Sequence, residues 1–197
     1  MRELSLNVMD IVQNSVTAKA TFIEIIVKEI TNDSLLSIND SLLSIIIKDN
    51  GCGMSEKQLK NVTDPFFTTR TTRSVGLGIP LFKMEAEQTG GSFSIDSEIG
   101  LGTTLKANFV TSHLDMTPLG NINSTVSILI RCNPDIDFLY RRSIDDKSFD
   151  LDTKELRQVL GNDVPLNSSE VMQWIDEYLK EQTQNLIGGK DNNEIIG

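Results

Sequence analysis

The sequence is poor in cysteine, histidine and basic side chains. It has two cysteines and one histidine in 197 residues, and 18 Lys and Arg stand against 28 Asp and Glu, which gives a net charge of −10. Because nucleic acid is gripped by clustered Lys and Arg, this balance disfavours a nucleic-acid partner. Cys52 and Cys132 lie far apart in no metal-ligand spacing, which fits a reducing compartment.

A long apolar run is also missing. No stretch reaches the roughly 18 consecutive apolar residues of a membrane span, and no segment resembles a signal peptide. We therefore expect a cytoplasmic protein with no membrane partner. The content of 39% hydrophobic and 23% charged residues is typical of a globular chain, and 197 residues suffice for one domain and an appendage.

The most informative stretch is Asp-Asn-Gly-Cys-Gly-Met at residues 49–54, directly after an apolar run. Its two glycines, Gly51 and Gly53, permit positive φ and close approach of the backbone to a flat ligand. Asp49 offers acceptor oxygens only. An ordinary turn has the same composition, so the interpretation depends on the motifs around it.

Residues 3–20 predict a helix, with an inward face at Leu4, Val8, Ile11, Val12 and Ser15. Asn7, Asp10 and Asn14 are three and four residues apart and share another face. Such a stripe is often just solvated. A carboxylate one turn before a carboxamide, however, also suits the binding of a hydrated cation.

Residues 22–30 alternate as a strand and are followed by a tandem duplication. Residues 32–38 (Asn-Asp-Ser-Leu-Leu-Ser-Ile) are repeated without change at 39–45. Because seven is odd, sliding by one copy would turn the faces of the strand over. We predict that the second copy, which runs into Asp49, is the strand and that the first is an enlarged hairpin loop.

The middle of the chain alternates helices, loops and strands. We expect a helix over residues 55–62, a loop Asp-Pro-Phe-Phe-Thr-Thr-Arg at 64–70, and a glycine-rich entry to a helix over 77–89. Residues 92–97 and 103–111 predict a hairpin.

The pattern changes after Pro118. A helix from residue 122 to Asn133, a hairpin of 137–143 and 147–151, helices over 151–160 and 169–182, and a frayed tail from 184 are expected. We therefore divide the chain into an N-terminal domain (1–112), a small α+β C-terminal region (113–183) and a flexible tail (184–197).

Five short motifs occur in one order that resembles the GHKL superfamily of ATP-binding proteins, which includes histidine kinases, gyrase B, Hsp90, MutL and anti-sigma-factor kinases. The helix around Asp10 and Asn14 looks like the N box, and residues 49–53 look like the G1 box. The F box, the G2 box and the final Gly-Thr element are matched by 64–70, Gly76-Leu77-Gly78 and 102–105. Each motif is weak alone, but their order is specific.

The resemblance implies an α/β fold, a two-layer α/β sandwich with helices on one face of a mixed sheet and ATP beneath a lid. Asp49 would accept the adenine amino proton, Gly51 and Gly53 would let the chain pass the ring, and Thr103 would support the ring. Residues 1–112 would be the histidine kinase-like ATP-binding domain.

The resemblance also implies the metal and phosphate contacts. Asn14 would bind Mg²⁺, and Asp10 would act as a base or support the metal. The remaining members of the implied nucleotide site lie in the lid and at the helix that follows it: Phe67, Thr68, Arg70, Arg73, Gly76 and Gly78. Ser74 stands where the G2 box usually opens with a further glycine.

Three functions stay open at this point. The protein could transfer the γ-phosphate to a protein partner in signalling, hydrolyse ATP as a conformational switch, or sense nucleotide without turnover. The chain begins at the N box, so we expect no helical hairpin carrying a phospho-accepting histidine. The single histidine, His113, is either structural or a displaced phospho-acceptor. The acceptor, the partner and a possible homodimer cannot be read from the sequence.

Overall fold

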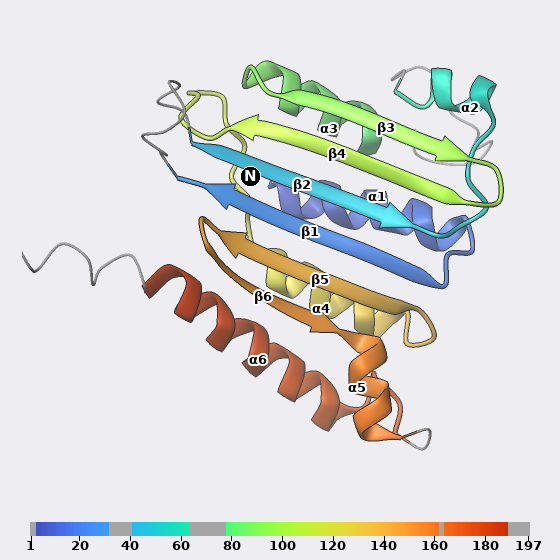
Figure 1. Ribbon diagram of the computed structural model, residues 1–197, viewed down its shortest axis with the longest axis vertical. Coiled ribbons are helices and arrows are strands. Elements are labelled where there is room, and N and C mark those ends of the chain that lie inside the picture. Colours follow the sequence, from blue (N-terminus) through green and yellow to red (C-terminus); the bar gives the residue numbers. More distant parts are fainter. Residues whose placement is uncertain (1–2, 32–40, 64–77, 162–163, 189–197) are drawn as a thin grey trace, which may run out of the picture.

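The computed structural model describes residues 3–31, 41–63, 78–161 and 164–188 (Figure 1). Along the chain its elements are α1 (Leu4–Thr17), β1 (Phe22–Ile30), β2 (Leu42–Asp49), α2 (Glu56–Asn61), α3 (Gly78–Gln88), β3 (Ser92–Glu98), β4 (Gly102–Val110), α4 (Ile122–Cys132), β5 (Asp137–Ile144), β6 (Lys147–Asp152), α5 (Thr153–Leu160) and α6 (Ser169–Gly188). Within these ranges no helix is both long and apolar enough to cross a membrane.

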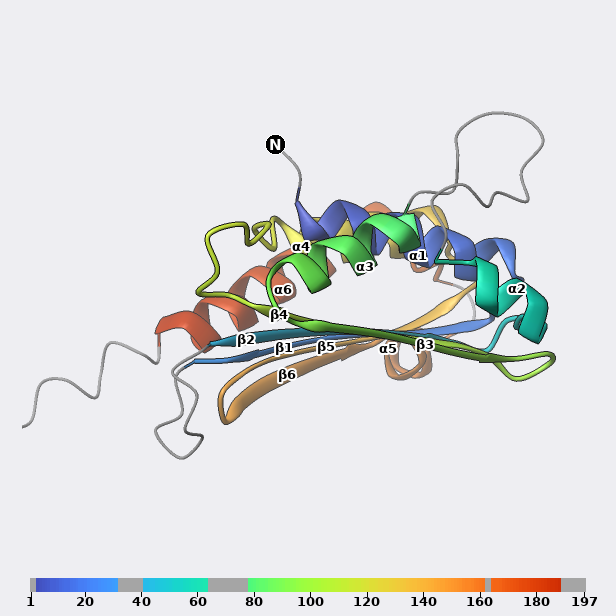
Figure 2. The ribbon, with the colours of Figure 1, turned by 90° about the horizontal axis from the view of Figure 1, so that it is seen from above.

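The strands form one mixed sheet in the order β3-β4-β2-β1-β5-β6. β1 and β5 are parallel, and every other neighbouring pair is antiparallel. Helices α1, α3, α4 and α6 lie together on one face of the sheet (Figure 2). The predicted two-layer α/β sandwich with a mixed sheet is therefore confirmed.

The core lies between these two layers and follows from the alternation of the strands. In β1 the inward residues Ile23, Ile25 and Val27 are fully buried, whereas Lys28 on the other face is exposed. The predicted inward face of α1 packs onto them, and its five residues are all buried: Leu4, Val8, Ile11, Val12 and Ser15. The helix ends at Thr17, before the predicted residue 20, and Lys19 has positive φ (63°).

The second copy of the duplicated segment, residues 39–45, contributes to a strand, as predicted. β2 begins at Leu42 within that copy, and Leu43 and Ile45 are buried on the inward face. Ile30 pairs with Leu42 at the end of the hairpin. The first copy, 32–38, lies outside the described residues.

The C-terminal region continues the same sheet. β5 lies beside β1, with Phe22 opposite Asp137, and the buried Phe138 and Tyr140 belong to the same apolar core as α1. The division of the chain at residue 112 stays a prediction.

Two predicted boundaries in this region are wrong. The helix expected from residue 151 begins at Thr153, because Leu151 is a buried residue of β6 and Asp152 caps the helix by accepting the Lys154 N–H. The tail expected from 184 is helical as far as Gly188. Leu186 follows Leu179 by two turns, so it shares the buried face of α6 and is only 5% exposed.

Candidate functional site

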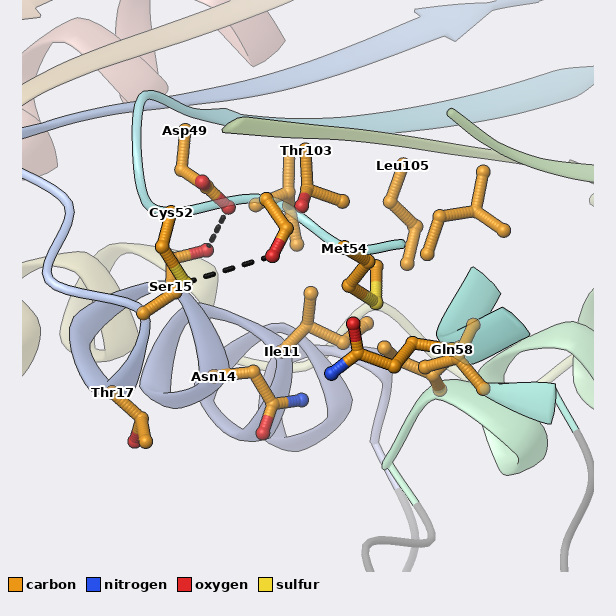
Figure 3. A pocket seen from close by; sticks show the side chains of 16 residues that line it. Ile11, Asn14, Ser15, Thr17, Asp49, Cys52, Met54, Gln58, Thr103 and Leu105 are labelled. Carbon is orange, nitrogen blue, oxygen red and sulfur yellow. Dashed lines mark hydrogen bonds between the residues drawn. The ribbon is translucent and has the colours of Figure 1, made fainter. Parts of the chain in front are cut away.

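A cavity of about 340 Å³ lies between α1, the loop after β2 and the beginning of β4 (Figure 3). Its walls are more apolar than polar, and this volume is within the range of small-molecule sites. The lining residues are Ile11, Asn14, Ser15, Thr17, Ala18, Ile47, Asp49, Cys52, Gly53, Met54, Gln58, Val62, Ile79, Ile95, Thr103 and Leu105.

Asp49 is the only carboxylate side chain among these lining residues, and the fold holds it firmly. It ends β2, with Ile23 on one neighbouring strand and Thr103 on the other. The residue is only 8% exposed. Its Oδ1 accepts the Gly51 N–H at 2.9 Å, and its Oδ2 accepts the Ser15 hydroxyl at 2.6 Å. Figure 3 shows the two side chains pointing toward one another.

The glycines of the loop are required by packing as well as by any ligand. Gly53 has φ of +66°, and a Cβ there would lie 1.9 Å from the Glu98 carbonyl oxygen. A Cβ on Gly51 would lie 2.9 Å from the Ala18 Cβ. The loop therefore passes so close to α1 and to β3 that larger residues do not fit.

Neighbouring side chains fix this loop at both ends. The Asn50 carboxamide oxygen accepts the N–H groups of Thr21 and Phe22, both at 2.9 Å. The Ser55 hydroxyl accepts the Gln58 N–H, so Ser55 caps α2. The floor of the cavity is thus set in place by the chain's own hydrogen bonds.

Thr103 is joined to a hydroxyl that sequence reasoning missed. Its Oγ1 lies 2.9 Å from the Ser97 Oγ. Ser97 Oγ also accepts the Met54 N–H and donates to the Gly102 carbonyl oxygen, each at 2.9 Å. Ser15 was placed on an inward face without a role, and nothing in the local sequence marks Ser97.

Asp10, Asn14 and Gly78 come together at one edge of the cavity. Asn14 lines the cavity, and both Asp10 and Asn14 are exposed side chains of α1. A Cβ on Gly78, the first residue of α3, would lie 3.0 Å from the Asp10 Cβ. The amino end of α3 therefore begins beside Asp10. Asn7 instead donates to Glu85 of α3, a contact that joins the two helices.

The remaining predicted site residues lie outside the described part of the chain: Phe67, Thr68, Arg70, Arg73 and Gly76. Of the lining residues that are described, none is Lys or Arg. The described ranges also hold no group of three or more His, Cys, Asp or Glu side chains that would bind a metal by itself. A Mg²⁺ ion at Asn14 would take further oxygen ligands from water and from a bound phosphate.

His113 is far from this cavity. Thr103, beside Asp49, and Val110 are seven residues apart on β4, which corresponds to about 23 Å, and His113 follows beyond Val110. Its side chain is partly exposed, and its Nδ1 accepts the Asp115 N–H at 3.1 Å. The imidazole therefore lies beyond the opposite end of β4 from Asp49 and Thr103.

Known structures of the same architecture include the crystal structure of the N-terminal domain of a DNA repair protein. It superposes with a TM-score of 0.54 over 82% of this chain and 58% of that chain, at 16% sequence identity. At this identity the similarity shows the fold alone.

Three curated proteins are similar to part of this chain, which spans less than a fifth of the length of each of them. A putative sensor protein of Shewanella frigidimarina (strain NCIMB 400) is 36% identical over 108 residues, which are 54% of this chain and 16% of that protein. A probable C4-dicarboxylate sensor kinase of Bacillus subtilis (strain 168) is 32% identical over 77 residues, 39% of this chain and 14% of the kinase. Sensor protein SrrB of Staphylococcus aureus (strain NCTC 8325 / PS 47) is 39% identical over 71 residues, 34% of this chain and 12% of SrrB.

The family model for the histidine kinase-, DNA gyrase B- and HSP90-like ATPases matches residues 2–117. The matched range contains the whole cavity with Asp49, Asn14 and Thr103. Since it covers more than half of the sequence, this chain belongs to the family of histidine kinase-, DNA gyrase B- and HSP90-like ATPases.

Proposed function

We propose that this protein binds ATP with Mg²⁺ and transfers the γ-phosphate to a protein partner in regulation or signalling. The observation that carries the proposal is the buried Asp49 carboxylate in a largely apolar cavity of about 340 Å³. An adenine ring suits such a site, because its faces are apolar and its amino group donates hydrogen bonds.

The walls of the cavity support a flat base. Ile11 comes from α1 and Ile79 from α3. Ile47 and Leu105 come from strands β2 and β4 of the sheet. Asp49 would accept from the amino group, while Gly53 keeps the loop close to the base. Thr103, next to Asp49 on the neighbouring strand, would face the same polar end of the ring.

The phosphates would extend toward Asn14 and Gly78, where the cavity has no cationic wall among the described residues. The amino end of α3 offers backbone N–H groups there. Asn14 would bind Mg²⁺ through its carboxamide oxygen, and the metal would offset the charge of the phosphates. Gly76, Phe67, Thr68, Arg70 and Arg73 enter the proposal from the family resemblance alone.

Asp10 is the residue that we assign to turnover. Its exposed carboxylate lies one helical turn before Asn14 and beside the first residue of α3. From there it would accept a proton from an attacking hydroxyl or water, or orient the metal. The acceptor would be another protein, since His113 lies at the far end of β4. The names of the similar sensor proteins, one a probable sensor kinase, support a role in signalling. Two free cysteines, Cys52 and Cys132, support a cytoplasmic location.

The test is incubation with ATP labelled at the γ-phosphate and Mg²⁺, while free phosphate, self-labelling and labelled partner are followed together. Phosphotransfer predicts label on protein, a switch predicts free phosphate alone, and a sensor predicts neither. Asp10→Asn should lower turnover at least about a hundredfold with ATP still bound. Glu87→Gln, an exposed change on α3, is the matched control.

Mg²⁺ dependence is tested separately with Asn14→Ala. Loss of a metal ligand should weaken binding of ATP with Mg²⁺ more than binding in EDTA, whereas Gln13→Ala on the same helix should change neither. Equal losses under both conditions would assign Asn14 a structural role instead.

A further inference from the structure

For two serine hydroxyls next to the cavity, Ser15 and Ser97, the hydrogen-bond partners determine which way the hydroxyl proton points. Ser15 Oγ lies 2.6 Å from Asp49 Oδ2, and the residue is 4% exposed. A carboxylate can only accept, so the Ser15 proton must point at Asp49. The lone pairs of Ser15 then face away from this bond, on the side of the cavity that Ser15 lines.

The contacts of Ser97 determine the direction of the Thr103 hydroxyl proton in the same way. Its Oγ has three neighbours: the Met54 N–H, which can only donate, the Gly102 carbonyl, which can only accept, and the Thr103 hydroxyl. A serine hydroxyl has one proton and two lone pairs. All three contacts are satisfied together only when Ser97 donates to Gly102 and Thr103 donates to Ser97.

The side chains of Asp49 and Thr103, which are neighbours on β2 and β4, therefore present only acceptors to the cavity. Both oxygens of the Asp49 side chain accept hydrogen bonds, one from the Ser15 hydroxyl and one from the Gly51 N–H, so toward the ligand this side chain offers acceptor oxygens. Thr103 donates its hydroxyl hydrogen bond to Ser97, so the Thr103 oxygen offers only lone pairs to the cavity. Because neither serine needs to touch the base to have this effect, both act through a neighbour.

We infer that Ser15 and Ser97 are positioning residues that make the cavity selective for a purine with an amino group at position 6 over one with an oxygen there. The inference rests on the proposed ATP binding. A 6-amino purine presents hydrogen-bond donors to these acceptors. A 6-oxo purine brings an acceptor against Asp49, and a buried pair of facing acceptors is unfavourable.

Loss of the Ser15 hydroxyl should change mainly the affinity for ATP, whereas loss of the Ser97 hydroxyl should change mainly the affinity for the 6-oxo nucleotide. Without the Ser15 hydroxyl, Asp49 keeps only the Gly51 N–H and loses its fixed orientation, so ATP binding weakens. Without the Ser97 hydroxyl, Thr103 is free to turn its proton toward the cavity, so binding of a 6-oxo purine improves. Both changes narrow the preference between the two nucleotides.

The test measures the affinities of the full chain for ATP and for inosine triphosphate by calorimetry. We expect wild type to prefer ATP by at least about tenfold. Ser15→Ala should weaken ATP binding about tenfold and inosine triphosphate binding much less. Ser97→Ala should shrink the preference at least about threefold. Ser97→Thr keeps the hydroxyl and should restore the wild-type ratio.

Matched controls come from the same elements. Ser5 is a buried serine of α1 whose hydroxyl donates to Glu3, and Ser94 is an exposed serine of β3. Alanine at either position should leave the ratio unchanged. Thermal unfolding of each variant reports on folding independently of the ligand.

The outcomes separate this inference from the proposed function. If Ser15→Ala and Ser97→Ala weaken both nucleotides equally, the serines are merely structural and the inference is overturned while ATP binding stands. If wild type binds both nucleotides equally, the acceptor-only assignment is wrong. If the folded wild type binds neither, the proposed function fails as well.

Discussion

Asp49 receives two hydrogen bonds and must still accept one from a ligand, so its replacement by Asn tests the site most directly. The carboxamide has one acceptor oxygen and would set its NH₂ against Ser15, Gly51 or the base. We expect Asp49→Asn to weaken ATP binding by about 2–3 kcal/mol, or about a hundredfold, by calorimetry. Asp96→Asn, an exposed change on β3, is the control. Wild-type affinity in folded Asp49→Asn would remove Asp49 from the site.

Tyr140 makes stability depend on alkaline pH. Burial raises the pKa of its phenol above the ordinary value of 10.0, and the hydroxyl donates to Asn123. Below about pH 10 the phenol is neutral in both states, so its contribution to stability is fully present there. As the pH rises toward the folded pKa, only the unfolded state releases the proton, and the free energy of unfolding falls by up to about 1.4 kcal/mol per pH unit.

Tyr140→Phe should remove this slope, at a cost of about 1 kcal/mol near neutral pH for the lost hydrogen bond. Denaturant unfolding between pH 7 and 11 measures both effects. Tyr178→Phe is the comparison, because that phenol is less buried and should change the slope less. A slope that Tyr140→Phe leaves unchanged would contradict the assignment.

At the scale of elements, local pattern predicted most of the fold. β1 spans residues 22–30 as its alternation indicated, and the two later hairpins occur where glycine or polar turns separate alternating runs. The parallel placement of β5 beside β1 was not predicted, because no local pattern says which distant strands become neighbours.

The candidate site likewise contains residues that local sequence patterns single out and residues that they do not. Asp49, Gly53 and Asn14 line the cavity, and each belongs to a short motif of fixed spacing that the sequence singles out. The hydroxyls of Ser15 and Ser97 acquire their roles only through the register of β2, β3 and β4. That register depends on tertiary packing, so these two residues were not predicted.

Deleting residues 32–38 tests the interpretation of the duplicated segment. The deletion leaves Thr31 and residues 39–41 between the paired Ile30 and Leu42, which is a hairpin loop of ordinary length. Since loop closure costs only about 0.6 kcal/mol per doubling of length, stability should be equal or slightly higher, with ATP binding intact. Thermal melts and calorimetry measure this. Unfolding of the variant would mean that the first copy is a strand after all.

The last turn of α6 is a second test at this scale. Leu186 is 5% exposed and its neighbour Ile187 is 53% exposed. Leu186→Ala should lower the free energy of unfolding by about 2–3 kcal/mol, whereas Ile187→Ala should change it by less than about 0.5 kcal/mol. Urea unfolding of the two variants gives the comparison. Equal effects would mean that the helix does not pack at this turn.

For the whole molecule, the binding site and the folding unit differ in extent. The cavity lies within the N-terminal part, yet β5 pairs with β1 and the buried Phe138, Tyr140 and Val126 complete the core. A fragment of residues 1–112 would expose the edge of β1 together with the core side chains beside it. We expect this fragment to aggregate or to unfold without a sharp transition, while the full chain unfolds cooperatively.

Calorimetric melts of both proteins decide the matter. A fragment with a sharp transition and full ATP affinity would show that the predicted N-terminal domain folds by itself and that the rest of the sheet is an addition to it.

The parallel pairing of β1 with β5 also has a consequence for synthesis of the protein. Asp137 follows its partner Phe22 by 115 residues, so the ribosome delivers β1 well before the strand that covers it. At ordinary translation rates the delay is on the order of ten seconds. During that time β1 offers an isoleucine-rich edge that two nascent chains on neighbouring ribosomes can share. The density of ribosomes on the messenger RNA, rather than the stability of the finished fold, should therefore limit the yield of folded protein.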